Sequence, residues 1–338
     1  MKKILSLLLL FPLLIYSQDE KKSALIMGDS DEDFFIMFYN VENLFDTVKN
    51  PTSNDASFTP SSEKKWNTHK YNYKLQQLAK VFTSIKKEAN NNTLPDIIGL
   101  CEVENKIVIN DLLNQSVFNS HDYTIIHQES ADLRGIDCAL LFDNKFELLK
   151  HDYIRIDNPE SERPTRDIVY AKLKYNDNVF NIFVNHWPSR WGGQIESNYK
   201  RVFAANILKK YIQNNTSSDE YTLIMGDFND YPTNESLKDV LVNDEFINLM
   251  QTDKVTGMGS YNFKGDWNWL DQIILSQNFI NNNLRILSGG SFQSEYMLYE
   301  SSKLNLVSRV FPSRTFGGNT WFGGFSDHLP IYFRFNFK

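Results

Sequence analysis

The sequence predicts an α/β fold, in which strands and helices alternate around a shared core. Two strand–helix–strand units carry this prediction. In the first, apolar runs at residues 34–39 and 96–101 flank a helical segment. Apolar residues recur on one face of that segment at helical spacing, namely Leu75, Leu78, Ala79, Phe82 and Ile85. In the second, strand-like runs at 179–185 and 221–225 flank a helix predicted over about 196–213.

Shorter apolar runs indicate an antiparallel portion of the fold. They lie near residues 122–127, 136–142, 146–156 and 167–174, with a last strand near 330–335. Each has the length of a strand. No linker rich in Pro, Gly or Ser divides the chain, and no short repeat recurs. A single domain is therefore predicted over residues 34–338.

The N-terminal segment predicts export. Two lysines precede an apolar run at residues 4–15, which is shorter than the roughly 20 apolar residues that a membrane-spanning helix needs. Together with the small residue Ser17, this pattern is typical of a secretory signal peptide over residues 1–17. Residues 18–33 then form an acidic, flexible lead-in. We expect a secreted or periplasmic protein with no transmembrane segment in the mature chain, and the alternative is an uncleaved membrane anchor.

Charge limits the partners of this chain. The formal net charge is −7 and the isoelectric point is about 5.5. A net-negative chain repels polyanions at long range, which argues against tight, non-specific binding to DNA. Nucleic acid is not excluded as a substrate, because a local basic cleft and a bound cation can reverse the field at a site. No stable protein partner is evident, and a monomer is expected.

The two cysteines, Cys101 and Cys138, both lie in apolar, strand-like runs. Export would permit a disulfide, but this setting favours buried free thiols. They lack the spacing and partner residues of a zinc site.

Polar side chains interrupt the apolar runs near the ends of the predicted strands, where a buried polar group needs a partner. These residues are Asn40, Glu102, His186, Asp227, Asn229, Asp271, Asp327 and His328. In α/β folds, strand ends also carry the functional site. Carboxylates, amides and imidazoles are the metal ligands and proton carriers that hydrolysis of a phosphate ester requires. No motif supports thiolate chemistry or a Ser-His-Asp triad.

Six segments resemble, in order, the motif series of the endonuclease/exonuclease/phosphatase superfamily. They read FYNVENLFD, IIGLCEVEN, NHWPSRWGG, IMGDFND, WNWLDQIILS and FSDHLP. The resemblance covers about residues 34–338 and is to deoxyribonuclease-like secreted nucleases in particular. It implies a four-layer sandwich of two packed mixed β-sheets with helices on both outer faces.

The resemblance also assigns a metal site. Glu102 would be the principal metal ligand, with Asn40 and Asp327 completing or supporting the site. Hard oxygen ligands suit Mg²⁺ or Mn²⁺, with Ca²⁺ as a further option.

The catalytic roles follow from the same resemblance. Asp227 would orient or deprotonate the attacking water, and Asn229 would hold the phosphate. His328 would contact the phosphate or supply a proton, while Asp271 fixes its tautomer. His186 would be the second histidine on the scissile phosphate.

Two supporting roles are predicted beside these. Asp137 is the candidate hydrogen-bond partner of His186. Arg190 is placed to bind the substrate as a bidentate phosphate clamp, and a surface salt bridge is the alternative.

The expected function is a secreted, divalent-metal-dependent phosphodiesterase, a nuclease that hydrolyses DNA or RNA. The alternative is a phosphodiesterase or phosphatase that acts on a lipid head group or a small phosphate ester. A non-catalytic binding module on the same scaffold is a third reading. The intact set of Glu102, His186, Asp227 and His328 argues against it.

Overall fold

The computed structural model describes most of the predicted domain. The described residues are 33–89, 92–161, 163–252, 255–281, 284–303 and 305–337. The predicted signal peptide and the acidic lead-in up to residue 32 lie outside them. Among the described helices, none is long and apolar enough to cross a membrane.

The first of two large sheets has seven strands. In spatial order they are β10 (Val255–Thr256), β14 (Leu284–Ser291), β19 (Ile331–Phe337), β1 (Phe34–Leu44), β2 (Ile97–Val103), β4 (Asp137–Asp143) and β3 (Tyr123–His127). The central strands β1 and β2 run parallel, with Phe38 opposite Gly99. β19 and β4 flank this pair in antiparallel orientation. The sheet is therefore mixed.

The second sheet has six strands. In spatial order they are β5 (Glu147–Ile154), β6 (Ile168–Tyr175), β7 (Asn178–His186), β8 (Tyr221–Asp227), β13 (Asp271–Ser276) and β9 (Phe246–Asn248). β7 and β8 are its parallel pair, and β8 pairs antiparallel with β13. β10 and β14 form a further short parallel pair in the first sheet. The parallel pairs β1–β2 and β7–β8 are each joined through a helix, α1 and α3, as the two strand–helix–strand units predicted.

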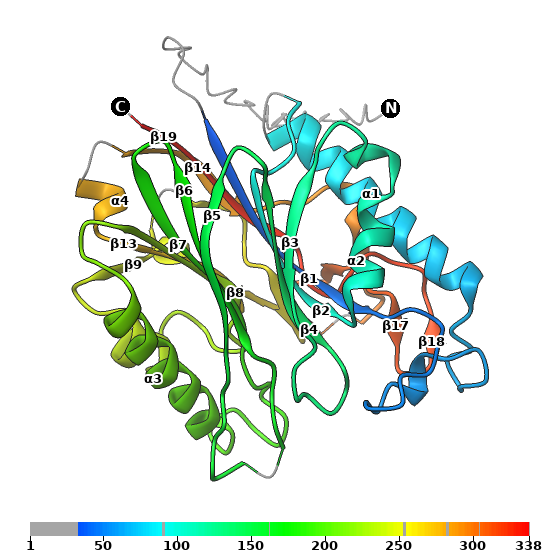
Figure 1. Ribbon diagram of the computed structural model, residues 1–338. Coiled ribbons are helices and arrows are strands. Elements are labelled where there is room, and N and C mark those ends of the chain that lie inside the picture. Colours follow the sequence, from blue (N-terminus) through cyan, green and yellow to red (C-terminus); the bar gives the residue numbers. More distant parts are fainter. Residues whose placement is uncertain are drawn as a thin grey trace, which may run out of the picture. The chain divides into compact units, whose positions relative to one another are not determined.

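The helices cover the outer faces of the two sheets (Figure 1). α1 (Thr68–Ala89) and α2 (Lys106–Leu113) pack on the seven-stranded sheet, and α3 (Asn198–Asn215) packs on the six-stranded sheet. The predicted four-layer sandwich is confirmed. The remaining short elements are α4 (Asn278–Asn281), the hairpin β11 (Tyr261–Phe263) with β12 (Asp266–Asn268), the pair β15 (Leu298–Glu300) with β16 (Val310–Pro312), and the hairpin β17 (Phe316–Gly317) with β18 (Thr320–Trp321). Short 3-10 or π turns lie at Ala56–Phe58, Ser116–Phe118, Ser236–Leu241, Leu249–Gln251 and Glu295–Met297.

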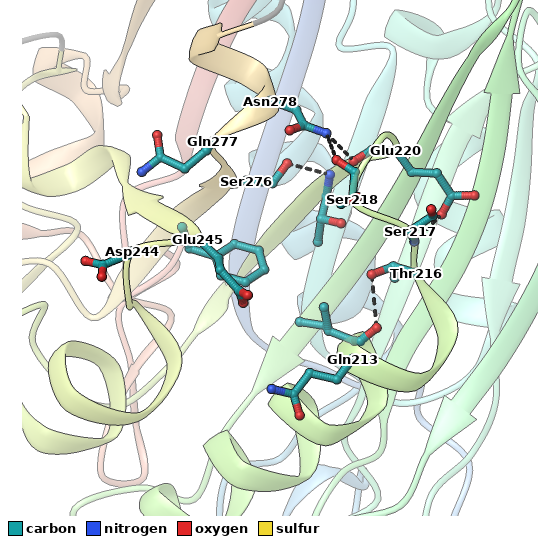
Figure 2. A pocket seen from close by; sticks show the side chains of 13 residues that line it. Gln213, Thr216, Ser217, Ser218, Glu220, Asp244, Glu245, Ser276, Gln277 and Asn278 are labelled. Atoms are coloured by element: carbon teal, nitrogen blue, oxygen red, sulfur yellow. Dashed lines mark hydrogen bonds between the residues drawn. The ribbon is translucent and has the colours of Figure 1, made fainter.

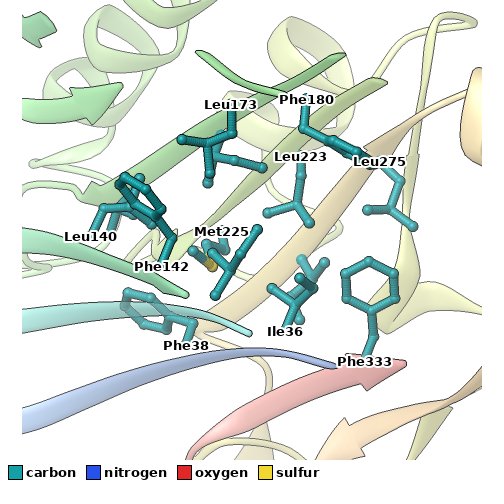
Figure 3. Packing of buried hydrophobic residues seen from close by; sticks show 14 of the residues in the cluster. Ile36, Phe38, Leu140, Phe142, Leu173, Phe180, Leu223, Met225, Leu275 and Phe333 are labelled. Carbon is teal, nitrogen blue, oxygen red and sulfur yellow. The ribbon is translucent and has the colours of Figure 1, made fainter. Parts of the chain in front are cut away.

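The strand β1 contributes to two of the three hydrophobic cores of the described residues. Successive side chains of a strand point to opposite faces, and β1 is buried on both. Phe34, Ile36 and Phe38 enter the core between the sheets, part of which is shown in Figure 3. The alternate residues Phe35, Met37 and Tyr39 pack toward the helices. A continuous apolar run is the sequence signature of such a strand.

The helix α2 is an element that the sequence does not predict. It has eight residues, too few for helical periodicity to distinguish it from a strand. The Asn105 side chain caps it by accepting hydrogen bonds from the amides of Ile107 and Val108.

The cysteines behave as predicted. Cys101 and Cys138 are buried free thiols that face each other across β2 and β4.

We predict that Gly226→Ala destabilises the fold more than Gly99→Ala. A methyl group at Gly226 would collide with the backbone carbonyl of Asn185 in the neighbouring strand, so β7 and β8 would have to move apart. At Gly99 the closest atom, 2.8 Å away, is the terminal methyl of Met225, which can rotate aside. Thermal unfolding should show a Tm lower by roughly 3–6 °C for Gly226→Ala. Equal Tm values for the two variants would contradict this account.

Candidate active site

The predicted polar residues meet at one end of the two sheets. Asn40 and Glu102 lie on β1 and β2, which run parallel and therefore end at the same edge. His186 is directly opposite Asp227 across β7 and β8, and Asp271 is opposite Asp227 across β8 and β13. Strand pairing thus gathers one group of polar residues in each sheet, and the packing of the two sheets joins the groups through Asn40 and Asp227.

Asp227 is the centre of this cluster. Its Oδ2 accepts a hydrogen bond of 3.0 Å from the side-chain amide of Asn40. The same oxygen lies 3.6 Å from Nε2 of His186 and 3.8 Å from Nε2 of His328. Burial raises the pKa of Asp227 well above its usual range, and Asp271 adds to the shift, although His328 opposes it. A carboxyl group with a raised pKa is suited to proton transfer near neutral pH.

His328 and Asp271 form a tightly bonded pair. Nδ1 of His328 lies 2.6 Å from Oδ2 of Asp271, and both side chains are buried. This contact leaves Nε2 of His328 facing Asp227. Burial alone would lower the pKa of His328, but the carboxylates of Asp271 and Asp227 outweigh it and raise that pKa well above its ordinary value. The second oxygen of Asp271, Oδ1, is buried without a hydrogen-bond partner.

His186 lies between two carboxylates. Its Nε2 is 3.9 Å from Glu102 Oε1 and 3.6 Å from Asp227 Oδ2. Burial lowers the pKa of His186 well below its ordinary value, and the cations Arg166 and Arg134 lower it further. A neutral imidazole therefore faces the two acidic groups at neutral pH.

The structure does not contain the hydrogen bond that was predicted between Asp137 and His186. Nδ1 of His186 is buried without a hydrogen-bond partner, and so is Oδ2 of Asp137. The other oxygen of Asp137 accepts from the backbone amide of Ser130, and its Oδ2 lies 3.9 Å from His127 Nε2. Asp137 begins β4, next to β2 and β3, whereas His186 ends a strand of the other sheet. No local pattern in the sequence indicates which residue accompanies this carboxylate.

The backbone is strained where it presents Glu102. The regular pairing of β2 with both neighbours breaks around Glu102, and this residue has a φ of +62°. Such a bulge redirects a side chain at a functional edge. One carboxylate oxygen, Oε2, accepts a hydrogen bond of 2.9 Å from the amide of Asn43. Burial and the charge of Asp327 raise the pKa of Glu102, so the two carboxylates repel each other.

Three residues of this site were missed by the sequence analysis. Arg314 donates from Nη2 to Asp327 Oδ2 at 2.6 Å, and its Nε lies 3.6 Å from Glu42 Oε1. The buried Lys74 donates to Thr315 Oγ1 at 2.6 Å and to the carbonyl of Phe325. Glu42 itself accepts from the amide of Thr315 at 2.6 Å.

Glu42 was the only one of these three with a sequence signal. It lies two residues after Asn40 within the first quoted motif, and an acidic residue is out of place in an otherwise apolar strand. Burial and Asp327 raise its pKa, although Lys74 opposes the shift. Lys74 and Arg314 sit in segments that contain many other polar residues, so no pattern singles them out.

Asn229 is held in a tight turn after β8. Its backbone amide donates to Asp227 Oδ1 at 2.9 Å, and its φ is +51°. The side-chain amide of Asn229 donates to the carbonyl of Trp187 at 3.0 Å. The turn thus fixes Asn229 beside Asp227, and its side-chain NH2 group keeps a second hydrogen that it can donate to a phosphate oxygen.

Arg190 is engaged with the protein itself. Its Nε donates to the carbonyl of Asn229 at 2.7 Å, and its Nη2 reaches Asp230 and Asn234 at 3.3 and 2.8 Å. Its guanidinium also lies over the ring of Tyr231, 3.9 Å from the ring centroid. These contacts occupy the edge that would bind phosphate in a bidentate manner, and they favour the salt-bridge alternative over the predicted clamp.

A buried cluster of potential metal ligands lies in this site. Among the described residues, one atom each of Asp227, Asp271 and His328 lies within 4.8 Å of the others. This cluster overlaps the predicted catalytic residues, whereas the predicted metal ligands are Asn40, Glu102 and Asp327. Nδ1 of His328 and Oδ2 of Asp271 already bond to each other at 2.6 Å. We therefore regard them as a hydrogen-bonded pair.

The structure also contains a pocket that does not coincide with the cluster of Asp227, Asp271 and His328. A cavity of about 480 Å³ lies between the N-terminal part of β8 and the C-terminal end of β13, where Thr222 and Ser276 line it (Figure 2). Asp227 and Asp271 occupy the opposite ends of the same two strands. Size alone therefore does not identify the functional site here.

The fold and this site define a hydrolase that acts on phosphate esters. A family model described as the Endonuclease/Exonuclease/phosphatase family matches residues 35–336. This chain belongs to that family, whose members hydrolyse phosphate esters. No curated protein sequence matches the chain.

Solved structures share the fold. An endonuclease/exonuclease/phosphatase family protein from Bacteroides thetaiotaomicron is 15% identical, covers 91% of this chain and 99% of its own, and has a TM-score of 0.58. TDP2 from D. rerio, complexed with a single strand DNA product, is 14% identical over 90% of this chain and 100% of its own, at a TM-score of 0.55. The mannosyl-6-phosphatase Bt3783 from Bacteroides thetaiotaomicron is 15% identical over 90% and 100%, also at 0.55.

We predict that Asp137→Asn stabilises the protein in a pH-dependent manner. Burial raises the pKa of Asp137 to about 7 and lowers the pKa of His127 to about 4, so the pair is neutral rather than ionic over much of this range. Because the fold favours protonated Asp137, wild-type stability is lost as pH rises from about 4 through 7. Asparagine carries no such penalty and can donate to His127.

Thermal unfolding at pH 4.5 and pH 8 tests this expectation. At each pH, the Tm of the wild type is subtracted from the Tm of Asp137→Asn. This difference should be larger at pH 8 than at pH 4.5 by about 3 °C or more. The exposed Asp177→Asn, on the turn between β6 and β7, is the control and should show no such change. The same Tm difference for Asp137→Asn at both pH values would refute the account.

Proposed function

We propose that this protein is a secreted, divalent-metal-dependent phosphodiesterase, and that it is a nuclease acting on DNA or RNA. The observation that carries the proposal is the convergence of Asn40, His186 and His328 on one carboxylate, Asp227. Export is proposed from the sequence of residues 1–17 alone.

The carboxylates beside this centre suit a hard cation. The pKa of Glu102 is raised by burial and then by Asp327, and Asp327 also raises the pKa of Glu42. Glu102 and Asp327 would hold a divalent cation whose charge would relieve that repulsion, and oxygen donors are what Mg²⁺ and Mn²⁺ prefer. Asn40 would support this metal site from beside it. Its side-chain NH2 donates to Asp227, and its side-chain oxygen accepts from the backbone amide of Glu42. When bound, the cation would neutralise charge on the phosphate oxygens.

The side chains of the chain supply the proton transfers. Asp227 is placed to take a proton from the attacking water, because its pKa is raised by burial. His328, held protonated by Asp271, donates hydrogen bonds from Nε2 to the phosphate or its leaving oxygen. The neutral His186 provides a second imidazole at the same phosphate. Asn229 fixes the phosphate from the turn that follows Asp227.

Nucleic acid is the favoured substrate class because TDP2 from D. rerio, which shares the fold, was solved with a single strand DNA product. A small phosphate ester or lipid head group is the second candidate. The net charge of −7 and the structural likeness to a mannosyl-6-phosphatase favour that alternative.

We predict that Glu102→Gln and Asp327→Asn each weaken Mn²⁺ binding about tenfold or more, because each removes a proposed oxygen ligand. Asp271→Asn should change the affinity by less than about threefold, since Asp271 is proposed to bond only to His328. Titration calorimetry or the electron paramagnetic resonance of free Mn²⁺ measures this without any substrate. The opposite order of effects would place the cation in the Asp227–Asp271–His328 cluster and overturn our ligand assignment.

We predict that Asp227→Ala and His328→Ala each lower turnover at least about a hundredfold, the usual cost of losing a positioned base or acid. The exposed Asp177→Ala and His151→Ala make the same chemical changes outside the site and should retain wild-type rates.

The assay should offer plasmid DNA, RNA, sphingomyelin and a chromogenic diester, each with Mg²⁺ or with chelator. Cleavage of nucleic acid that chelator abolishes would support the nuclease. Activity on the lipid or a monoester alone would support the second candidate. Near-normal rates for both Asp227→Ala and His328→Ala would disprove the site.

A further inference from the structure

A basic cleft lies beside the active site. It has a volume of about 360 Å³ and is formed by the loops that follow β3, β5 and β7 together with the start of α3. The charged and aromatic residues that line it are Asp132, Arg134, Arg163, Arg166, Trp191 and Lys200. Four of these are cationic and one is acidic, in a chain whose net charge is −7.

The cleft begins at the proposed phosphate site. Arg166 in its wall donates from Nη2 to the carbonyl of Trp187 at 2.7 Å, and Asn229 donates to the same carbonyl at 3.0 Å. Arg166 and Arg134 are also close enough to His186 to lower its pKa, after the larger effect of burial. A substrate whose phosphate meets Asn229 would therefore extend directly into the cleft.

The positive charge of the cleft is only partly neutralised. Asp132, the carboxylate among the described residues that line it, pairs with Arg166 at 3.2 Å and with Arg134 at 3.4 Å. Nε of Arg166 is buried without a hydrogen-bond partner. No carboxylate within the described ranges forms an ion pair with Arg163 or Lys200, so both remain available to an anion.

An exposed tryptophan forms one wall of the cleft. Trp191 is 82% exposed, which is costly for so large an apolar ring. Arg163 lies 5.8 Å from the ring centroid, so a cation and an aromatic face are presented together. This pairing is the one with which proteins bind single-stranded nucleic acid, where bases stack on aromatic rings and cations hold the backbone.

We propose that this cleft binds the nucleotide that flanks the scissile phosphate in a single-stranded substrate. The base stacks on Trp191, and the neighbouring phosphate contacts Lys200 and Arg163. Duplex substrates fit poorly, because paired bases are stacked on both faces and offer no free face to Trp191. The inference rests on the proposed nuclease function and specifies its substrate.

The test compares a long and a short substrate of the same enzyme. Trp191→Ala and Lys200→Glu should each lower kcat/KM for a single-stranded oligonucleotide about tenfold. Hydrolysis of bis(p-nitrophenyl) phosphate, which lacks the nucleobase and the neighbouring phosphate that the cleft is proposed to bind, should stay unchanged. Trp191→Phe keeps an aromatic face and should restore most of the activity on the oligonucleotide.

Two control variants match these changes outside the cleft. Lys210→Glu reverses a charge on an exposed residue of the same helix α3, about 15 Å further along its axis. Tyr299→Ala removes an exposed aromatic ring from β15. Both should leave kcat/KM for the oligonucleotide at the wild-type value.

Binding provides a second readout that does not depend on turnover. Fluorescence anisotropy of a labelled oligonucleotide, measured in chelator at several salt concentrations, gives the slope of log Kd against log salt concentration. For Lys200→Glu this slope should be smaller than that of the wild type by about one released ion. Lys210→Glu should keep the wild-type slope.

The outcomes separate the two claims. Equal losses on the oligonucleotide and the small diester, or no loss on either, would overturn the flanking-nucleotide site while leaving the nuclease intact. An equal effect of Trp191→Ala on duplex and single-stranded DNA would overturn the preference for single strands. Hydrolysis of sphingomyelin vesicles or small esters, with none of any nucleic acid, would instead disprove the nuclease and the site with it.

Discussion

The hydrogen bond between Asn40 and Asp227 is the contact on which the rest of the site depends. It joins β1 of one sheet to β8 of the other, 3.0 Å between the two side chains. The apolar core holds the sheets together elsewhere, so the polar edge can be buried only if its groups satisfy each other. Asp227 meets that requirement by accepting from Asn40 while both imidazoles approach the same oxygen.

The site is built on strained backbone that the regular sheets support. Glu42, Asn43, Glu102 and Asn229 all have positive φ values, although none is glycine. Each such residue costs on the order of 1–3 kcal/mol and persists only where the surrounding structure fixes it. Here β1, β2 and β8 are buried and paired on both sides. The rigid interior therefore allows the ends of these strands to turn their polar side chains toward one another.

Electrostatic balance explains the residues that surround this centre. Burial raises the pKa of Glu42 and of Glu102, and the nearby charge of Asp327 raises both pKa values further. Lys74 on α1 and Arg314 in the loop before β19 offset part of the repulsion between these carboxylates. The remaining acidity is what a divalent cation would neutralise, while the cations of the neighbouring cleft face an anionic substrate. Opposite charges are thus segregated over a short distance.

The sequence by itself determined the elements and the chemistry of this protein. The continuous apolar run of β1, the helical periodicity of α1 and the polar residues at strand ends are local patterns, and they predict the α/β layers and the reactive groups. Only the tertiary structure decided which side chains become neighbours in the site. Asp137 lies beside His127 and forms no hydrogen bond with His186, and Lys74 and Arg314 reach the site from segments without any motif. A side chain reaches only a few ångströms, so its partners depend on which strands become neighbours, and that is fixed by packing between residues far apart in the chain.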